Sequence, residues 1–194
     1  MATPKHQRVF IWIIAIVMAI GSLGAYFVTI LANDNGEVAQ SDSSQQAQID
    51  AYVKQQEEAA RANAALASPL EGYSAATFDA ASVTSLQKED LVVGTGDVVA
   101  EGATVTVSYF GWTPDGKIFD STTKSGTNTP AADFPLEVGK LIDGWVSGLP
   151  GMKVGGVRKL VIPAAQAYKE AGSPPLIAAN TPLTFILRVE SIKQ

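Results

Sequence analysis

An uncharged stretch near the start of this 194-residue chain limits its fold more than any other feature. The 24 residues from 9 to 32 contain no Asp, Glu, Lys or Arg. As a helix rising about 1.5 Å per residue, this stretch extends roughly 36 Å, enough to cross the hydrocarbon core of a bilayer. Two basic residues precede it and two acidic residues follow it closely. By the positive-inside rule we expect a single-pass anchor in the cell membrane at 9–32. The tail at 1–8 is expected in the cytoplasm and the C-terminal part outside it.

A cleaved signal peptide is the competing interpretation of the same residues. The apolar region of a signal peptide runs 7–15 residues and ends at a small-residue cleavage site. The stretch here is longer, and no clear A-x-A site follows it. The sequence therefore favours an uncleaved anchor, although cleavage stays open.

Residues 33–83 are interpreted as a linker that contains a helical spacer. The segment at about 44–67 is rich in Gln, Glu and Ala and lacks Gly and Pro, a composition that favours a helix. Its apolar residues are too sparse to predict a coiled coil. It is therefore either a solvated spacer or a helix that binds a partner or a second copy. From Pro69 to about Val83, a run rich in Ser and Ala is expected to form a second linker.

The composition excludes several classes of function. The chain has no Cys, so a disulfide framework, a thiolate metal site and a cysteine nucleophile are impossible. Its one His, His6, lies in the N-terminal tail, which removes a Ser-His-Asp triad or a His-rich zinc site from the folded part. With a net charge of -5 and scattered basic residues, the chain is not expected to bind nucleic acid.

The C-terminal region, 84–194, is predicted to be an α+β domain. Val105, Val107 and Tyr109 alternate with polar residues, the period of a half-buried strand. Strands are expected at about 104–109, 118–119, 159–162 and 183–192, and a short helix at 141–149. One short helix packed on an antiparallel sheet leaves room for a concave apolar pocket between them.

Seven motifs in this region, taken in order, resemble the FKBP-type peptidyl-prolyl cis/trans isomerases in a membrane-anchored, bacterial-like form. They are Val107–Trp112 (VSYFGW), Asp115–Ser121 (DGKIFDS), Phe134–Gly139 (FPLEVG), Leu141–Trp145 (LIDGW), Gly151–Gly155 (GMKVG), Ile162–Tyr168 (IPAAQAY) and Asn180–Phe185 (NTPLTF). The resemblance covers about residues 86–193. Their common order and spacing make the joint pattern far more specific than any one motif.

The resemblance implies a twisted antiparallel β-sheet wrapped around one short helix, with a prolyl-isomerase pocket between them. It implies six catalytic residues, which are Tyr109, Phe119, Asp120, Trp145, Tyr168 and Phe185. It also implies five substrate-binding residues, which are Phe134, Val138, Leu141, Ile142 and Ile177. In the family the proline ring rests on the indole equivalent to Trp145, and the equivalent of Tyr168 donates a hydrogen bond to a substrate carbonyl. The Ile142 N–H is expected to bind the carbonyl that follows the proline.

Prolyl isomerisation breaks no covalent bond, so this pocket needs no metal and no cofactor. The barrier of about 18–20 kcal/mol arises from amide resonance, which is lost as the C–N bond twists. An apolar pocket favours the less polar twisted state, and hydrogen bonds to the flanking carbonyls hold it. The implied partners are proline-containing polypeptides, with macrolides as inhibitors of the same pocket.

Some positions beside the pocket depart from the family pattern. Lys169 stands where the family has Gly, and Ala178 and Ala179 replace a usual Pro pair. The leading interpretation is an isomerase that assists the folding of extracytoplasmic proteins. The alternative is a membrane-tethered chaperone or proline-peptide binding module without catalysis.

Overall fold

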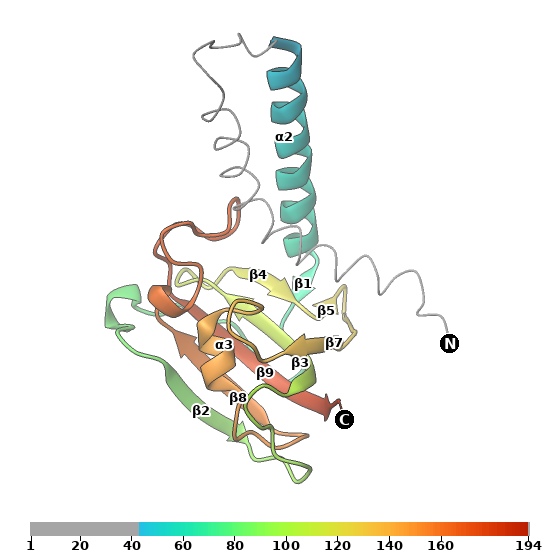
Figure 1. Ribbon diagram of the computed structural model, residues 1–194, viewed down its shortest axis with the longest axis vertical. Helices are drawn as coiled ribbons and strands as arrows, with labels where there is room; N and C mark the ends of the chain where they lie inside the picture. Colours follow the sequence, from blue (N-terminus) through green and yellow to red (C-terminus); the bar gives the residue numbers. More distant parts are fainter. Residues whose placement is uncertain (1–42, 194) are drawn as a thin grey trace, which may run out of the picture. The chain divides into compact units, whose positions relative to one another are not determined.

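The computed structural model describes residues 43–193 (Figure 1). The anchor predicted at 9–32 and the tail predicted at 1–8 lie outside these residues. Between residues 43 and 193, no helix combines the length and the apolar character needed to cross a bilayer. The chain separates into two units, Met1–Val53 and Lys54–Gln194, and the second contains all the strands given below.

The predicted strands and helices are present in the expected order, together with further strands that were not predicted. The helices and short 3-10 turns are α2 (Ser43–Ala65), η1 (Ala80–Ser82), α3 (Asp143–Gly148) and η2 (Ala164–Gln166). The strands are β1 (Ala67–Ser68), β2 (Gln87–Val92), β3 (Thr104–Trp112), β4 (Ile118–Ser121), β5 (Thr123–Lys124), β6 (Thr127–Asn128), β7 (Ala131–Pro135), β8 (Val157–Ile162) and β9 (Leu183–Ile192). Helix α2 therefore occupies nearly the same range as the helix expected at 44–67.

The larger sheet is antiparallel, with the strand order β2-β8-β9-β3-β4. Strand β3 pairs with β9 along one side, and with β7 and then β4 along the other. The register of β3 shifts near Thr106/Val107 and again near Gly111/Trp112, as at β-bulges, which bend a strand and increase its twist. The prediction of an antiparallel sheet with one short helix is confirmed.

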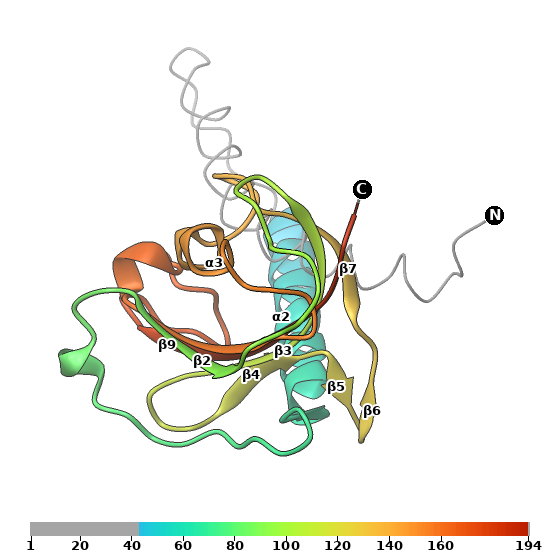
Figure 2. The same cartoon turned by 90° about the horizontal axis from the view of Figure 1, so that it is seen from below.

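Helix α3 packs against one face of this sheet, which we call the inner face (Figure 2). Two glycines let the helix backbone approach β8. A Cβ atom at Gly144 would lie 2.4 Å from Ile162 Cγ2, and one at Gly148 would lie 2.6 Å from Leu160 Cδ1. Any larger side chain at these positions would push α3 away from the sheet.

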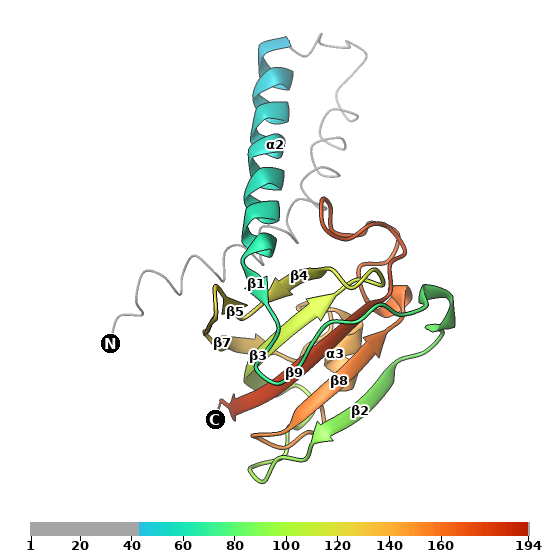
Figure 3. The ribbon, with the colours of Figure 1, turned by 180° about the vertical axis from the view of Figure 1, so that it is seen from behind.

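Residues 69–79, which we call the strap, cover the opposite face, the outer face, as the segment that runs from β1 across β3 and β9 in Figure 3. Leu70 in the strap is only 4% exposed, and Tyr73 and Phe78 pack against the same outer cluster. The Trp112 indole Nε1 donates to the Ala76 carbonyl at 2.8 Å. The segment predicted as a second linker is therefore packed against the sheet.

The strap is packed because both faces of β3 carry large apolar side chains. Phe110 and Trp112 alternate with the inner-face residues, and their rings stack at 5.1 Å with an interplanar angle of 17°. Ser108, expected on a solvated face, is 0% exposed. The strand is therefore buried on both sides rather than half-buried, and apolar surface of this size needs a cover.

Candidate active site

Aromatic side chains from several elements surround Trp145 of α3 on the inner face. The ring centroids of Tyr109, Phe185 and Phe134 lie 5.1, 5.3 and 5.6 Å from that of Trp145. Their interplanar angles with the indole are 81°, 83° and 66°, so the rings meet edge to face, a favourable geometry for aromatic pairs. Phe119 extends the group, with its ring 5.5 Å from Phe185. The structure thus brings together the five predicted aromatic residues of the sheet and of α3.

A glycine in β3 makes room for two of these rings. Gly111 pairs with Phe185 across β3 and β9. A Cβ atom at Gly111 would lie 2.4 Å from Phe185 Cε1 and 2.7 Å from Phe119 Cζ. The absence of a side chain at this point lets the rings of Phe119 and Phe185 lie over the backbone of the central strand.

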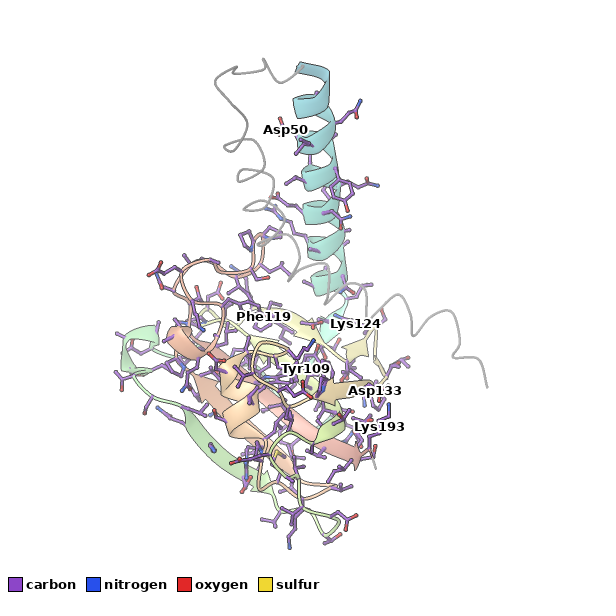
Figure 4. The ribbon with its side chains drawn as sticks, viewed as in Figure 1. Asp50, Tyr109, Phe119, Lys124, Asp133 and Lys193 are labelled. Carbon is purple, nitrogen blue, oxygen red and sulfur yellow. The ribbon has the colours of Figure 1, made fainter. Side chains whose placement is uncertain are left out.

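Asp120 forms the polar end of the aromatic group. The Tyr109 hydroxyl donates to Asp120 Oδ2 at 2.5 Å, and the Ser121 N–H donates to Asp120 Oδ1 at 2.8 Å. The Lys124 ammonium donates to the same Oδ1 at 3.1 Å. Figure 4 shows Tyr109, Phe119 and Lys124 in this part of the domain. The carboxylate is therefore held from three directions, and it fixes the Tyr109 hydroxyl.

The two tyrosines of the site keep their protons far above neutral pH. Burial, and secondarily the nearby Asp120 carboxylate, raises the pKa of Tyr168 to about 12. Burial also raises the pKa of Tyr109 well above its usual range, and the charge of Asp120 adds to this effect. Both hydroxyls are consequently donors at physiological pH, so Tyr168 can donate to a carbonyl as the resemblance implies.

In the loop after Tyr168, Lys169 adopts the backbone conformation expected of the glycine that the family has at this position. Lys169 has a φ of 55°, in the left-handed region that glycine usually occupies. Its carbonyl accepts from the Asn180 N–H at 2.8 Å, and its ammonium lies 3.1 Å from Asp143 Oδ2 at the start of α3. The substitution thus retains the turn and adds an ion pair between this loop and α3.

Of the remaining predicted residues, three lie in or against the core cluster that contains Trp145, and one is exposed. Ile177 is 3% exposed within the core cluster that contains Trp145, and Leu141 and Ile142 pack against that cluster. The Ile142 carbonyl accepts from the Trp145 N–H at 2.9 Å, which sets the first turn of α3. Val138 is the exception, because its side chain is 82% exposed and is not brought into the aromatic group. The role of Val138 in substrate binding therefore stays a prediction.

Three residues that shape the site were not predicted from the sequence. Gly111 and Gly144 act through the space they leave, and only the neighbouring side chains reveal that space. Lys124 lies four residues after Asp120. In a strand-rich region this separation does not predict contact, since the four-residue spacing places side chains together on a helix. The only available signal was a cation near an acidic residue.

Comparisons with known proteins agree with this geometry. A family model described as FKBP-type peptidyl-prolyl cis-trans isomerase matches residues 96–190. FK506-binding protein 4 of Dictyostelium discoideum is 42% identical over 111 residues, which are 57% of this chain and 29% of that protein. A peptidyl-prolyl cis-trans isomerase of Saccharomyces cerevisiae is 41% identical over 105 residues, 54% of this chain and 24% of that protein. The chain thus spans less than a third of the length of these curated relatives.

A smaller relative is matched over nearly its whole length. The crystal structure of a peptidyl-prolyl cis-trans isomerase from Pseudomonas syringae pv. tomato aligns with a TM-score of 0.50 and 32% sequence identity. The alignment covers 71% of this chain and 93% of that one. The family model therefore spans β3 to β8, α3, most of β9 and the aromatic group, and the chain belongs to the FKBP-type peptidyl-prolyl cis-trans isomerase family.

Proposed function

We propose that the domain at 84–194 catalyses cis/trans isomerisation of Xaa-Pro bonds in polypeptides. The observation that carries this proposal is the edge-to-face aromatic group around Trp145, which has a carboxylate and two protonated tyrosines beside it. The aromatic surface provides an apolar seat for a proline ring. The hydroxyl of Tyr168 provides a donor for a substrate carbonyl.

The site suits a reaction whose barrier is rotational. The cis and trans forms of an Xaa-Pro bond differ by only about 0.5–1 kcal/mol, so an enzyme need change only the rate. Loss of amide resonance makes the twisted bond less polar than the planar one, and a seat lined by Trp145, Phe119 and Phe185 favours that state over water. A hydrogen bond from Tyr168 to a flanking carbonyl holds the chain while the bond turns. The reaction requires no nucleophile, metal or cofactor.

The substrates and location follow from the N-terminal sequence. The uncharged stretch at 9–32 and the charges around it support a single-pass anchor with a cytoplasmic tail at 1–8. The isomerase domain then faces the extracytoplasmic side, where newly exported, proline-containing polypeptides fold.

Macrolides that present an apolar ring and carbonyls would compete with proline-containing polypeptides for the same aromatic group. A non-catalytic chaperone or binding module remains the alternative function for this domain.

Isomerase assays on the full chain in detergent separate these alternatives. We expect the chain to accelerate isomerisation of an Xaa-Pro peptide, and a macrolide to inhibit it. Tyr168→Phe should lower kcat/KM about tenfold, the loss expected for one hydrogen bond made in the transition state. Asp120→Asn should cause a similar loss, because it weakens the acceptor that fixes the Tyr109 hydroxyl. Tyr73→Phe is the matched control, since it removes a hydroxyl from the strap on the outer face. Peptide binding without acceleration would establish the binding-module alternative.

Protease accessibility tests the proposed location. In spheroplasts of a bacterial host that expresses the full chain, we expect added protease to degrade the C-terminal domain while a tag placed before residue 1 stays protected. Protection of the C-terminal domain together with loss of the tag would reverse the proposed orientation. Recovery of the chain in the soluble fraction, shortened by the N-terminal stretch, would establish a cleaved signal peptide instead.

A further inference from the structure

We propose that Lys124 is a positioning residue for Asp120, and that the junction of α2 and β1, residues 63–68, holds it in place. This inference rests on the proposed isomerase function and extends it to a part of the chain that precedes the residues matched to the family, 96–190. It assigns the junction a role in the geometry of the active site.

Lys124 is enclosed to an unusual degree for a lysine. Its side chain is only 14% exposed, although lysine is among the residues least often buried. Its ammonium lies 3.1 Å from Asp120 Oδ1 and 3.4 Å from the Asn63 carbonyl oxygen in the last turn of α2. Figure 4 shows Lys124 beside this end of α2. The Asn63 carbonyl also accepts from the Leu66 N–H at 3.3 Å. Carbonyls at a helix C-terminus carry partial negative charge, so they favour a cation there.

The backbone on either side of the lysine is bound to the same junction. Strand β1 pairs with β5, with Ala67 opposite Lys124. The Ser125 N–H donates to the Leu66 carbonyl at 3.0 Å. Lys124 is therefore held through its main chain and its side chain by residues 63–68, and its ammonium has little freedom to leave Asp120.

The junction also contacts Ser121, the second group that donates to Asp120 Oδ1. The Ser121 hydroxyl donates to the Ser68 carbonyl at 2.7 Å, and the Ser121 N–H donates to Asp120 Oδ1 at 2.8 Å. The carboxylate is thus flanked by two groups, Lys124 and Ser121, that both contact residues 63–68.

These contacts form a continuous path to the aromatic group. The Asn63 carbonyl contacts Lys124, Lys124 pairs with Asp120, and Asp120 accepts from the Tyr109 hydroxyl. The Tyr109 ring in turn meets Trp145 edge to face at 5.1 Å. If the cation is lost, the carboxylate keeps the hydrogen bonds from Tyr109 and Ser121 but loses its balancing charge, which weakens its hold on the position that fixes Tyr109. The effect should appear in kcat more than in KM, because the proline seat is left intact.

The decisive experiment is a double-mutant cycle on the full chain, with isomerase activity and thermal unfolding measured for each variant. Lys124→Met should lower kcat/KM about tenfold with the loss mainly in kcat, and Lys124→Arg should restore it to within about threefold. In an Asp120→Asn background, Lys124→Met should change kcat/KM by less than about twofold, because a residue that acts only through its partner shows full coupling. The matched control is Lys117→Met, whose lysine side chain is 84% exposed and pairs with Asp115.

Variants of α2 test the junction without altering the lysine. Ala64→Gly combined with Ala65→Gly loosens the last turn of α2 next to Asn63, whereas Ala59→Gly combined with Ala60→Gly loosens an earlier turn. We expect a several-fold loss of kcat/KM for the first pair and no loss for the second. This arm remains informative if Lys124→Met fails to fold.

Three outcomes would overturn the inference while leaving the proposed function intact. The first is an unchanged kcat/KM for Lys124→Met. The second is an equal loss of kcat/KM for Lys124→Met in the wild-type and Asp120→Asn backgrounds. The third is an equal loss of kcat/KM for the two pairs of glycine substitutions in α2. A wild-type chain without isomerase activity would instead overturn the proposed function, and the inference with it.

Discussion

Both faces of the larger sheet carry buried aromatic residues, but only the inner face forms the candidate active site. On the inner face, Trp145 is 5% exposed and meets the Tyr109 ring edge to face, and the Tyr109 hydroxyl donates to the Asp120 carboxylate. On the outer face, Trp112 is 3% exposed, stacks flat on Phe110 and is covered by the strap. Burial of aromatic rings is therefore common to both faces. What separates the active site from the structural face is the group of polar side chains held beside the rings.

The largest expected effect concerns the outer face. Trp112→Ala should lower the free energy of unfolding by about 3–5 kcal/mol, because it leaves a cavity beneath the strap and removes the hydrogen bond to Ala76. The molecules that remain folded should keep their turnover, since Trp112 faces away from Trp145. Urea unfolding and activity per folded molecule, measured at low temperature, check this. A large loss of turnover in the folded fraction would show that the outer face belongs to the active site.

A substitution behind α3 should affect both stability and turnover. Gly144→Ala should cost about 1–3 kcal/mol of unfolding free energy, because the new methyl group meets Ile162 and pushes α3 from β8. Trp145 moves with the helix, so kcat/KM should also fall. Ser147→Ala, at an exposed position of the same helix, serves as the control. Normal activity in Gly144→Ala would show that the site tolerates a displaced helix.

High pH should weaken the inner face through its tyrosines. The unfolded chain releases the Tyr168 proton near pH 10, whereas burial raises the pKa in the folded state to about 12. Since the folded state binds more protons between these values, stability should fall as the pH rises from about 10 to about 12. Chemical unfolding at a series of alkaline pH values measures the slope. Tyr168→Phe should make that slope shallower, and an unchanged slope would contradict the assignment.

The smallest effect is expected in the loop after Tyr168, at Lys169. Lys169→Gly relieves the left-handed conformation of Lys169, worth roughly 1 kcal/mol, but removes an exposed ion pair with Asp143 worth about 0–1 kcal/mol. Stability should therefore change little. Lys169→Ala should be less stable than Lys169→Gly, because it loses the pair and keeps the strain. A marked loss of activity in Lys169→Gly would make the lysine part of peptide recognition.

The sequence predicted the inner face more completely than the outer one. Tyr109, Phe119 and Phe185 lie in strands whose alternation is visible, and their motifs resemble a known family. The packing of the strap was not predicted because its apolar residues, Leu70 and Phe78 among them, are isolated in a run of small and polar residues without a period. Its partner Trp112 lies 36 residues from Ala76, so local patterns carry no trace of their contact.

By itself, the sequence determined the kinds of side chain available to the domain. They include aromatic rings, tyrosine hydroxyls and the Asp120 carboxylate, and they include no Cys and no His beyond the tail. These limit the chemistry, since the charge and polarity of a side chain are properties of the residue. Only the tertiary structure decided which face the strap covers, that Val138 lies exposed, and that Lys124 meets both Asp120 and the end of α2. Contacts of this kind depend on close packing between distant segments, and such packing is a property of the whole fold.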